Sequence, residues 1–179
     1  ILRDSFMYSC TSNCVLGYML GLGDRNLHNI LICGETATIA NIDFSYLLGY
    51  DPKNIESTEM KITSGMVDML GGYESQEFNT LKTMCSSIYA SLRIYTYFWY
   101  AMFRYLPVTS PSIHPHGGDL KTLQLHIDNR LMPNATDEEV KVAIVKSVNS
   151  NSDSWQSSIS DMAHSVKTNI TGMIFNLEL

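Results

Sequence analysis

The chain has 179 residues, of which 45% are hydrophobic and only 17% are charged, and its formal net charge is −6. This length favours one domain with a sizeable core, and the composition excludes disorder, collagen or a charged coiled coil for the chain as a whole. Because the Lys and Arg residues form no block along the chain, we expect no nucleic-acid partner.

The chain begins with an apolar periodicity that is typical of a helix. Residues from Phe6 to Met19 recur at spacings of three and four, which places them on one helical face, and Gly21 ends the helix. Two β-rich runs follow, Asn29–Cys33 and Thr38–Asp43, with a turn between them. They predict a short hairpin.

The rest of the chain is predicted to be helical around one long loop. Residues 44–63 form the loop, and a short helix covers Ser64–Leu70. Helical period then runs from Ser75 to Tyr105, which predicts one central helix over 75–105. A further helix is expected over Asp119–Arg130. The predicted fold class is therefore mostly α with a short β-hairpin.

The end of the chain carries two more predicted helices. Thr136 and Glu139 fit the capping box T-x-x-E, which begins a helix that continues to about Val148. A polar break follows, and residues 155–179 are expected to form a C-terminal helix and an apolar tail.

One apolar stretch, Ile94–Phe103, has only ten residues between two arginines. Since a bilayer span needs about twenty, no transmembrane segment is expected, and the stretch is predicted to be a buried helix. Its aromatic residues are expected to lie in the core, with lipid contact as the alternative; they are Tyr95, Tyr97, Phe98, Trp99 and Tyr100.

The four cysteines stand at positions 10, 14, 33 and 85, without a C-x-x-C pair. This pattern favours buried free thiols in a reducing compartment, and hence a cytoplasmic protein.

The chemistry of the chain is concentrated between Gly21 and Phe44. A loop with the sequence G-L-G-D-R-N-L-H-N leads into the hairpin, and I-D-F follows it. A tight hairpin would bring together Asp24, Asn29 and Asp43, whose oxygen atoms suit Mg²⁺ completed by phosphates. Protein kinases use the same order of a catalytic Asp, an Asn five residues later and a second Asp. The pattern therefore predicts phosphoryl transfer.

These motifs resemble the C-terminal lobe of the phosphatidylinositol 3-/4-kinase catalytic domain, which carries G-x-G-D-R-H-x-x-N and H-I-D-F-G. The segment S-C-T-S-N-C-V-L-G-Y-M-L-G-L-G-D-R is most similar to the class III phosphatidylinositol 3-kinases of vacuolar sorting and autophagy. D-F-S-Y-L-L-G-Y-D-P-K and M-K-I-T-S-G-M-V-D-M-L-G-G support the same subclass. The resemblance covers nearly all of residues 1–179, as a kinase-like C-lobe with the N-terminal lobe outside this chain.

The resemblance implies a role for individual positions. Residues 21–29 fall on the catalytic loop, with Asp24 on its catalytic Asp, and Arg25 is implied to order the loop. Asn29 and Asp43 fall on the ligands of Mg²⁺ or Mn²⁺. Leu31 and Ile42 fall on the positions that pack against the adenine of ATP.

Residues 43–61 fall on the activation loop, which reads the lipid head group. Its only basic residues are Lys53 and Lys61. Phosphorylated inositides require more cations, because each phosphate favours a charge-assisted partner. Phosphatidylinositol in a membrane surface is therefore the expected substrate. Regulatory subunits and a peripheral place on endosomal or autophagic membranes are also implied.

Three positions depart from the family pattern. Asn26 replaces a His proposed to handle the proton of the inositol hydroxyl, and His28 lies two residues further on as a substitute or as a solvated surface residue. Asn41 and Ser45 replace the His and Gly of H-I-D-F-G. The leading hypothesis is a phosphatidylinositol 3-kinase. The alternatives are a catalytically impaired pseudokinase or binding module and, third, a related serine/threonine protein kinase.

Overall fold

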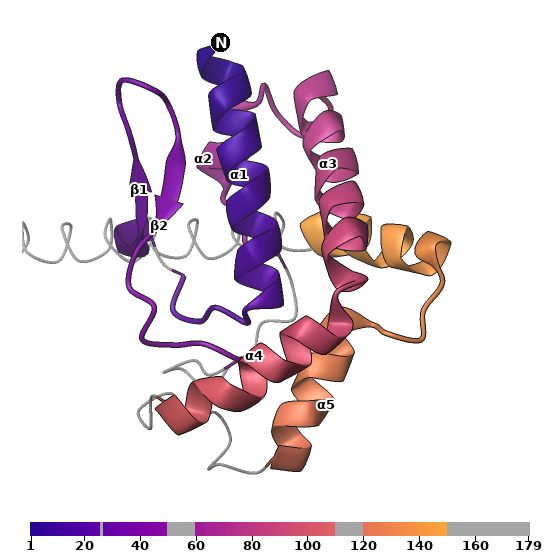
Figure 1. Ribbon diagram of the computed structural model, residues 1–179. Helices are drawn as coiled ribbons and strands as arrows, with labels where there is room; N and C mark the ends of the chain where they lie inside the picture. The colour runs from indigo at the N-terminus through magenta and orange to yellow at the C-terminus, as the bar shows by residue number, and fades with distance from the viewer. Residues whose placement is uncertain (26, 50–59, 110–119, 150–179) are drawn as a thin grey trace, which may run out of the picture.

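The computed structural model describes residues 1–25, 27–49, 60–109 and 120–149, and Figure 1 shows its elements. The sheet consists of β1 (Ile30–Ile32) and β2 (Ile39–Asn41), and a short 3-10 helix, η1 (Leu27–Asn29), precedes it. The helices are α1 (Leu2–Met19), α2 (Ser64–Met69), α3 (Gln76–Arg93), α4 (Thr96–Thr109) and α5 (Leu120–Leu131). Residues 137–149 are also helical. The predicted fold class, mostly α with one short hairpin, is confirmed.

The core forms mainly where α1 and α3 run side by side (Figure 1). Phe6 and Cys10 of α1 and Phe78 and Leu81 of α3 have at most 1% of their surface exposed. These are the apolar positions whose three- and four-residue spacing predicted both helices, and their burial drives the packing. The other end of this interface is closed by the Tyr18 and Tyr89 rings, which meet edge to face with centroids 5.8 Å apart.

The hairpin lies against α1 on the side away from α3 (Figure 1). Its strands are antiparallel, with Leu31 opposite Ala40 and Ile32 opposite Ile39. A two-stranded hairpin is marginal in water by itself. Here Ile39 is buried against the core, so α1 supplies the support that a further strand would give.

The start of the helix at 137–149 confirms the predicted capping box. The backbone N–H of Glu139 donates to Thr136 Oγ1, and the backbone N–H of Thr136 donates to Glu139 Oε2. α2 also lies close to its predicted range. None of the helices among the described residues combines the length and apolarity that crossing a bilayer requires. The predicted C-terminal helix and tail, 155–179, lie outside these residues.

The prediction of one central helix over 75–105 is wrong, because α3 ends at Arg93 and α4 begins at Thr96. The Leu92 carbonyl accepts from the Tyr95 N–H at 3.2 Å and from the Trp99 indole at 2.9 Å. A side chain that bonds to a helix carbonyl diverts it from its normal partner four residues on, and this breaks the helix.

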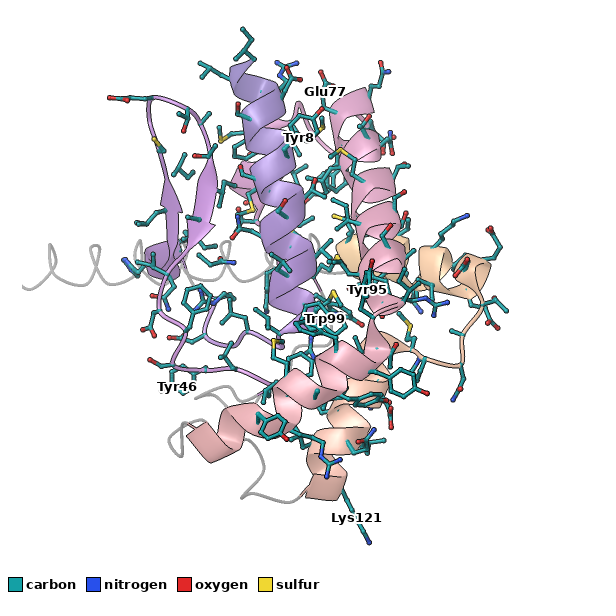
Figure 2. All side chains as sticks on the ribbon, viewed as in Figure 1. Tyr8, Tyr46, Glu77, Tyr95, Trp99 and Lys121 are labelled. Carbon is teal, nitrogen blue, oxygen red and sulfur yellow. The ribbon has the colours of Figure 1, made fainter. Side chains whose placement is uncertain are left out.

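The helix break also overturns the prediction that the aromatic cluster is buried. Tyr95, Tyr97 and Phe98 are 60%, 90% and 61% exposed. Trp99 is 7% exposed and so is the one residue of the five that is buried; Figure 2 shows it beside Tyr95 at the junction of α3 and α4. Periodicity correctly indicated helix here, but it could not show that the axis turns.

The cysteine prediction holds for three positions out of four. All four cysteines are free, and Cys10, Cys14 and Cys85 are buried between α1 and α3. Cys33 is exposed at the tip of the hairpin, against the prediction. Burial raises the pKa of the Cys85 thiol well above its ordinary value, which keeps it protonated and unreactive.

Candidate active site

The loop into the site turns sharply at Gly21. This residue has φ +58°, and a Cβ there would lie 2.5 Å from the Gly49 nitrogen and 2.8 Å from His126 Nε2. The Gly21 carbonyl accepts from the Gly49 N–H at 2.8 Å, so two segments of the site touch through their backbones. Any side chain at position 21 would separate them. The requirement for glycine here is therefore steric as well as conformational.

Two of the three residues that the hairpin is expected to bring together, Asp24 and Asn29, are in contact. Asn29 Nδ2 donates to the Asp24 backbone carbonyl at 2.8 Å and to Asp24 Oδ2 at 3.2 Å. The short helix η1 turns the chain back so that Asn29 faces Asp24. Because the Nδ2 atom makes these bonds, the amide oxygen of Asn29 is the atom suited to a metal.

The hairpin places Asp43 near the other end of this loop. The Ile42 N–H donates to the Asn29 carbonyl at 3.0 Å, which continues the ladder of β1 and β2 by one step. Asp43 follows directly, with φ +58°, and Asp24 also has a positive φ of 47°. Positive φ is uncommon outside glycine and is concentrated at functional sites. Asp is among the residues that adopt this conformation most readily, and the described chain shows it also at Ala37, Leu48 and Met132.

Arg25 connects the two parts of the site. Its guanidinium is buried and donates to the carbonyls of Gly23 at 2.8 Å, Asn29 at 3.3 Å and Ile42 at 2.8 Å, and also to that of Asp43. Burial lowers the pKa of this guanidinium, while the neighbouring Asp24 and Asp43 oppose the shift. The loop-ordering role implied for Arg25 is confirmed.

The Asp43 carboxylate is exposed and has a local partner. Oδ1 accepts from the Ser45 hydroxyl at 2.6 Å and from the Ser45 N–H at 3.1 Å. These hydrogen bonds hold the pKa of the Asp43 carboxyl below its usual 3.8, so the group is ionised at neutral pH. Ser45, which stands where the family has Gly, thus donates hydrogen bonds to one oxygen of the proposed metal ligand Asp43.

The two positions that the resemblance assigns to adenine packing lie on the exposed side of the hairpin. Leu31 pairs with Ala40, and Ile42 comes two residues after Ala40, so alternation places all three on one face. Leu31 is 52% exposed and Ile42 is 37% exposed, whereas Ile39 on the opposite face is buried against α1. An apolar, open surface therefore adjoins the Asp24 and Asn29 side chains.

The remaining predicted positions are His28, Asn26, Lys53 and Lys61. His28 lies exposed on η1, one residue before Asn29. Asn26 and Lys53 fall outside the described residues. Lys61 lines a pocket with Arg25 and Asn41, and its carbonyl accepts from Cys14 Sγ at 3.4 Å. Tyr46, on the segment below the hairpin (Figure 2), accepts at its carbonyl from the Gly23 N–H.

Comparison with known proteins agrees with this geometry. The family model "Phosphatidylinositol 3- and 4-kinase" matches residues 1–111. The chain belongs to that family.

Individual relatives point the same way. The chain is 39% identical over 93 residues, 52% of its length, to phosphatidylinositol 3-kinase pik3 of Schizosaccharomyces pombe. It is 30% identical over 167 residues, 93% of its length, to the phosphatidylinositol 3-kinase catalytic subunit type 3 of Caenorhabditis elegans. These matches span only 11% and 18% of the respective relatives.

Proposed function

We propose that this chain is the part of a phosphatidylinositol 3-kinase that carries the catalytic loop and the metal ligands. The reaction is transfer of the ATP γ-phosphate to the 3-hydroxyl of phosphatidylinositol. The observation that carries the proposal is the 3.2 Å contact between Asn29 Nδ2 and Asp24 Oδ2, at the base of the hairpin that ends in Asp43. The names of the relatives agree with this substrate.

The side chains at the site fit a Mg²⁺ or Mn²⁺ ion bound together with ATP. Asn29 and Asp43 offer one amide and one carboxylate as ligands. Among the described residues, no group of three or more His, Cys, Asp or Glu side chains is placed to hold a metal ion. Mg²⁺ is usually bound by one or two carboxylates and by substrate phosphates rather than by an all-protein cage. When bound, the ion would neutralise charge that develops on the transferred phosphoryl group.

The other residues would orient the reactants. Leu31 and Ile42 offer the adenine an apolar face, so the phosphates would extend toward Asn29 and Asp43. Asp24 is ionisable and held against Asn29, where it would accept or orient the proton of the attacking hydroxyl. His28 is a second candidate for that proton, because Asn26 cannot act as a base. Arg25 would keep these groups in register without touching substrate.

The substrate loop and the cellular setting follow from the same family membership. Lys53 and Lys61 are too few to neutralise a phosphorylated head group, which favours plain phosphatidylinositol at a membrane surface. We further propose a cytoplasmic enzyme that acts peripherally on endosomal or autophagic membranes. Its N-terminal lobe and regulatory subunits would be supplied by regions and chains beyond these 179 residues.

One observation favours a second candidate, a catalytically impaired pseudokinase of the same fold. The Ser45 hydroxyl donates to Asp43 Oδ1 at 2.6 Å, so one carboxylate oxygen is already engaged. Together with Asn26, this departure would reduce turnover more than nucleotide binding.

The test is phosphorylation of phosphatidylinositol vesicles by the full-length protein with ATP and Mg²⁺. We expect the 3-phosphorylated lipid as the product, and its loss when Mg²⁺ is chelated. Nucleotide binding without lipid turnover would support the pseudokinase, and transfer to a protein substrate instead of lipid would overturn the assignment.

A further inference from the structure

The outward edge of β2 is held by two polar side chains of α1. In this hairpin the inward-facing groups of Thr38, Ala40 and Ile42 belong to the ladder with β1. Alternation then turns the N–H and carbonyl groups of Ile39 and Asn41 away from β1. Such edge groups need other partners when they are not in contact with water.

Ser9 and Asn13, one helical turn apart on α1, provide those partners. The Ile39 N–H donates to Ser9 Oγ at 2.9 Å. Asn13 Nδ2 donates to the Ile39 carbonyl at 2.8 Å, and Asn13 Oδ1 accepts from the Asn41 N–H at 3.2 Å. The carboxamide of Asn13 therefore binds β2 in the way that the backbone of a third strand would.

These contacts lie very close in sequence to the proposed metal ligand. Asp43 is two residues after Asn41, and the carbonyls of Ile42 and Asp43 are bound by Arg25. The backbone from Ile39 to Asp43 is thus held by α1 on its first part and by Arg25 on its second part. Because α1 packs along α3, these contacts connect the backbone at Asp43 to the core of the molecule.

Ser9 and Asn13 contribute little to that core themselves. Both are half-buried and lie beside Phe6 and Cys10 on the same side of α1, but neither belongs to the cluster of buried apolar residues that forms the core. Removing either polar side chain should therefore leave the α1–α3 packing intact while releasing the edge of β2.

We propose that Ser9 and Asn13 are positioning residues that set the place of Asp43 for metal–nucleotide binding. This inference rests on the proposed function insofar as Asp43 is a metal ligand. Misplacing a ligand by a fraction of an ångström weakens the site even when the fold is kept, because metal geometry is demanding.

Two matched pairs of variants in the full-length protein test the proposal. Asn13→Ala is compared with Asn79→Ala, because Asn79 of α3 makes the same bond to a carbonyl four residues earlier but does not bond to the hairpin. Ser9→Ala is compared with Ser12→Ala, whose hydroxyl bonds only to the Tyr8 carbonyl among the described contacts. Each control removes the same local helix bond without touching β2.

The first measurement is hydrogen exchange of the peptide that covers residues 38–44. We expect faster exchange there in Asn13→Ala and Ser9→Ala, roughly threefold to tenfold for the loss of one or two hydrogen bonds. Exchange in α1 and α3 should match that of the controls. Unchanged exchange in 38–44, or equal acceleration throughout α1 and α3, would overturn the proposal.

The second measurement is equilibrium binding of Mn²⁺ in the presence of ATP, followed by electron paramagnetic resonance without any turnover. We expect weaker Mn²⁺ binding, by about threefold or more, in the two test variants and wild-type binding in the two controls. Equal Mn²⁺ binding in all four variants would overturn the positioning role. A wild-type protein that binds Mn²⁺ and ATP but phosphorylates no lipid would refute the proposed function alone.

Discussion

Arg25 Nη1 donates to the Ile42 carbonyl at 2.8 Å and so joins the loop that follows α1 to the end of β2. The same guanidinium bonds to the Gly23 and Asn29 carbonyls on the loop side. The relative position of Asp24 and Asp43 therefore depends in part on this one buried side chain, besides the contacts of the hairpin with the loop and with α1. Its planar set of donors is what allows it to reach carbonyls in several directions at once.

The Arg25→Lys variant should loosen the hairpin although it keeps the charge. A lysine ammonium has three donors on one atom and cannot span the carbonyls of Gly23, Asn29 and Ile42. We expect the free energy of local opening at residues 38–44, from hydrogen exchange, to fall by about 2 kcal/mol, the scale of hydrogen bonds to a charged group. Arg3→Lys, at the exposed pair with Glu77, is the control and should change nothing there. Full protection in Arg25→Lys would contradict the argument.

The Asp43→Asn variant tests the metal ligand without disturbing its backbone. Asn tolerates the positive φ of 58° as well as Asp does, and the side chain is exposed, so the thermal unfolding temperature should be unchanged. Loss of a carboxylate ligand should reduce lipid phosphorylation by at least about 100-fold, because such a metal contributes several kcal/mol. Asp68→Asn, a change of the same type on α2, is the control. Normal turnover in Asp43→Asn would remove Asp43 from the site.

The hairpin and the order of the catalytic residues could be predicted from the sequence because both depend on local signals. A turn between two β-rich runs fixes the hairpin, and the hairpin is expected to bring Asp24, Asn29 and Asp43 together; the Asp24–Asn29 contact agrees with this. The roles of Ser9 and Asn13 could not be predicted in this way. They arise from contacts with residues 26 to 30 positions away, and a polar residue on a helix gives no local sign of such a partner.

The aromatic residues of α4 show a second limit of sequence reasoning. Composition alone predicts that a run such as 94–103 is buried, because large apolar side chains usually are. The Trp99 indole instead binds the Leu92 carbonyl and begins a new helix axis, which leaves Tyr97 90% exposed. This bond lies at the junction of α3 and α4, where the change of helix axis alters which residues of α4 point inward.

The Ser45→Gly variant should raise lipid turnover if the pseudokinase features limit the chemistry. It restores the family residue and removes the hydroxyl that bonds to Asp43 Oδ1 at 2.6 Å. Losing the shorter of the two hydrogen bonds to this oxygen should increase the turnover number severalfold, and up to about tenfold for about 1.4 kcal/mol of barrier. Ser45→Ala also removes the hydroxyl but does not add the backbone freedom of glycine, so it isolates the effect of the hydroxyl; it should give a similar gain. No gain in either variant would show that the Ser45 bond is compatible with metal binding.

The pH dependence of the turnover gain in Ser45→Gly shows whether the gain comes from the lost hydrogen bond or from a change in the protonation of Asp43. The Ser45 bonds depress the pKa of the Asp43 carboxyl below 3.8, so their stabilisation of the ionised form is present above that value and is lost as pH falls through the folded-state pKa. Removing the hydroxyl bond raises this pKa toward 3.8 and leaves the backbone N–H bond in place, so the group is still ionised at neutral pH. The gain in Ser45→Gly should therefore be the same at pH 6.5 and at pH 8. A gain confined to one of these values would implicate another titrating group.

The Asn26→His variant tests the proton-handling position in the full-length protein. A positioned general base typically contributes roughly 10²–10⁴-fold to rate, and Asn26 cannot supply it. If the lost His limits the chemistry, Asn26→His should raise lipid turnover by at least about tenfold, or about 1.4 kcal/mol of barrier. Nucleotide affinity should hardly change, because Asn29 and Asp43 are untouched.

His28→Ala separates the remaining explanations, because His28 lies exposed one residue before Asn29 and is the nearest substitute base in sequence. If His28 has taken over the proton, His28→Ala should be the damaging change and Asn26→His should be nearly neutral. In a pseudokinase neither substitution would alter turnover. Lipid turnover and ATP affinity measured for both variants distinguish the three cases, since each predicts a different pair of turnovers. A large rise in ATP affinity without any change in turnover would contradict all three, because each assigns nucleotide binding to Asn29 and Asp43, which both variants leave unchanged.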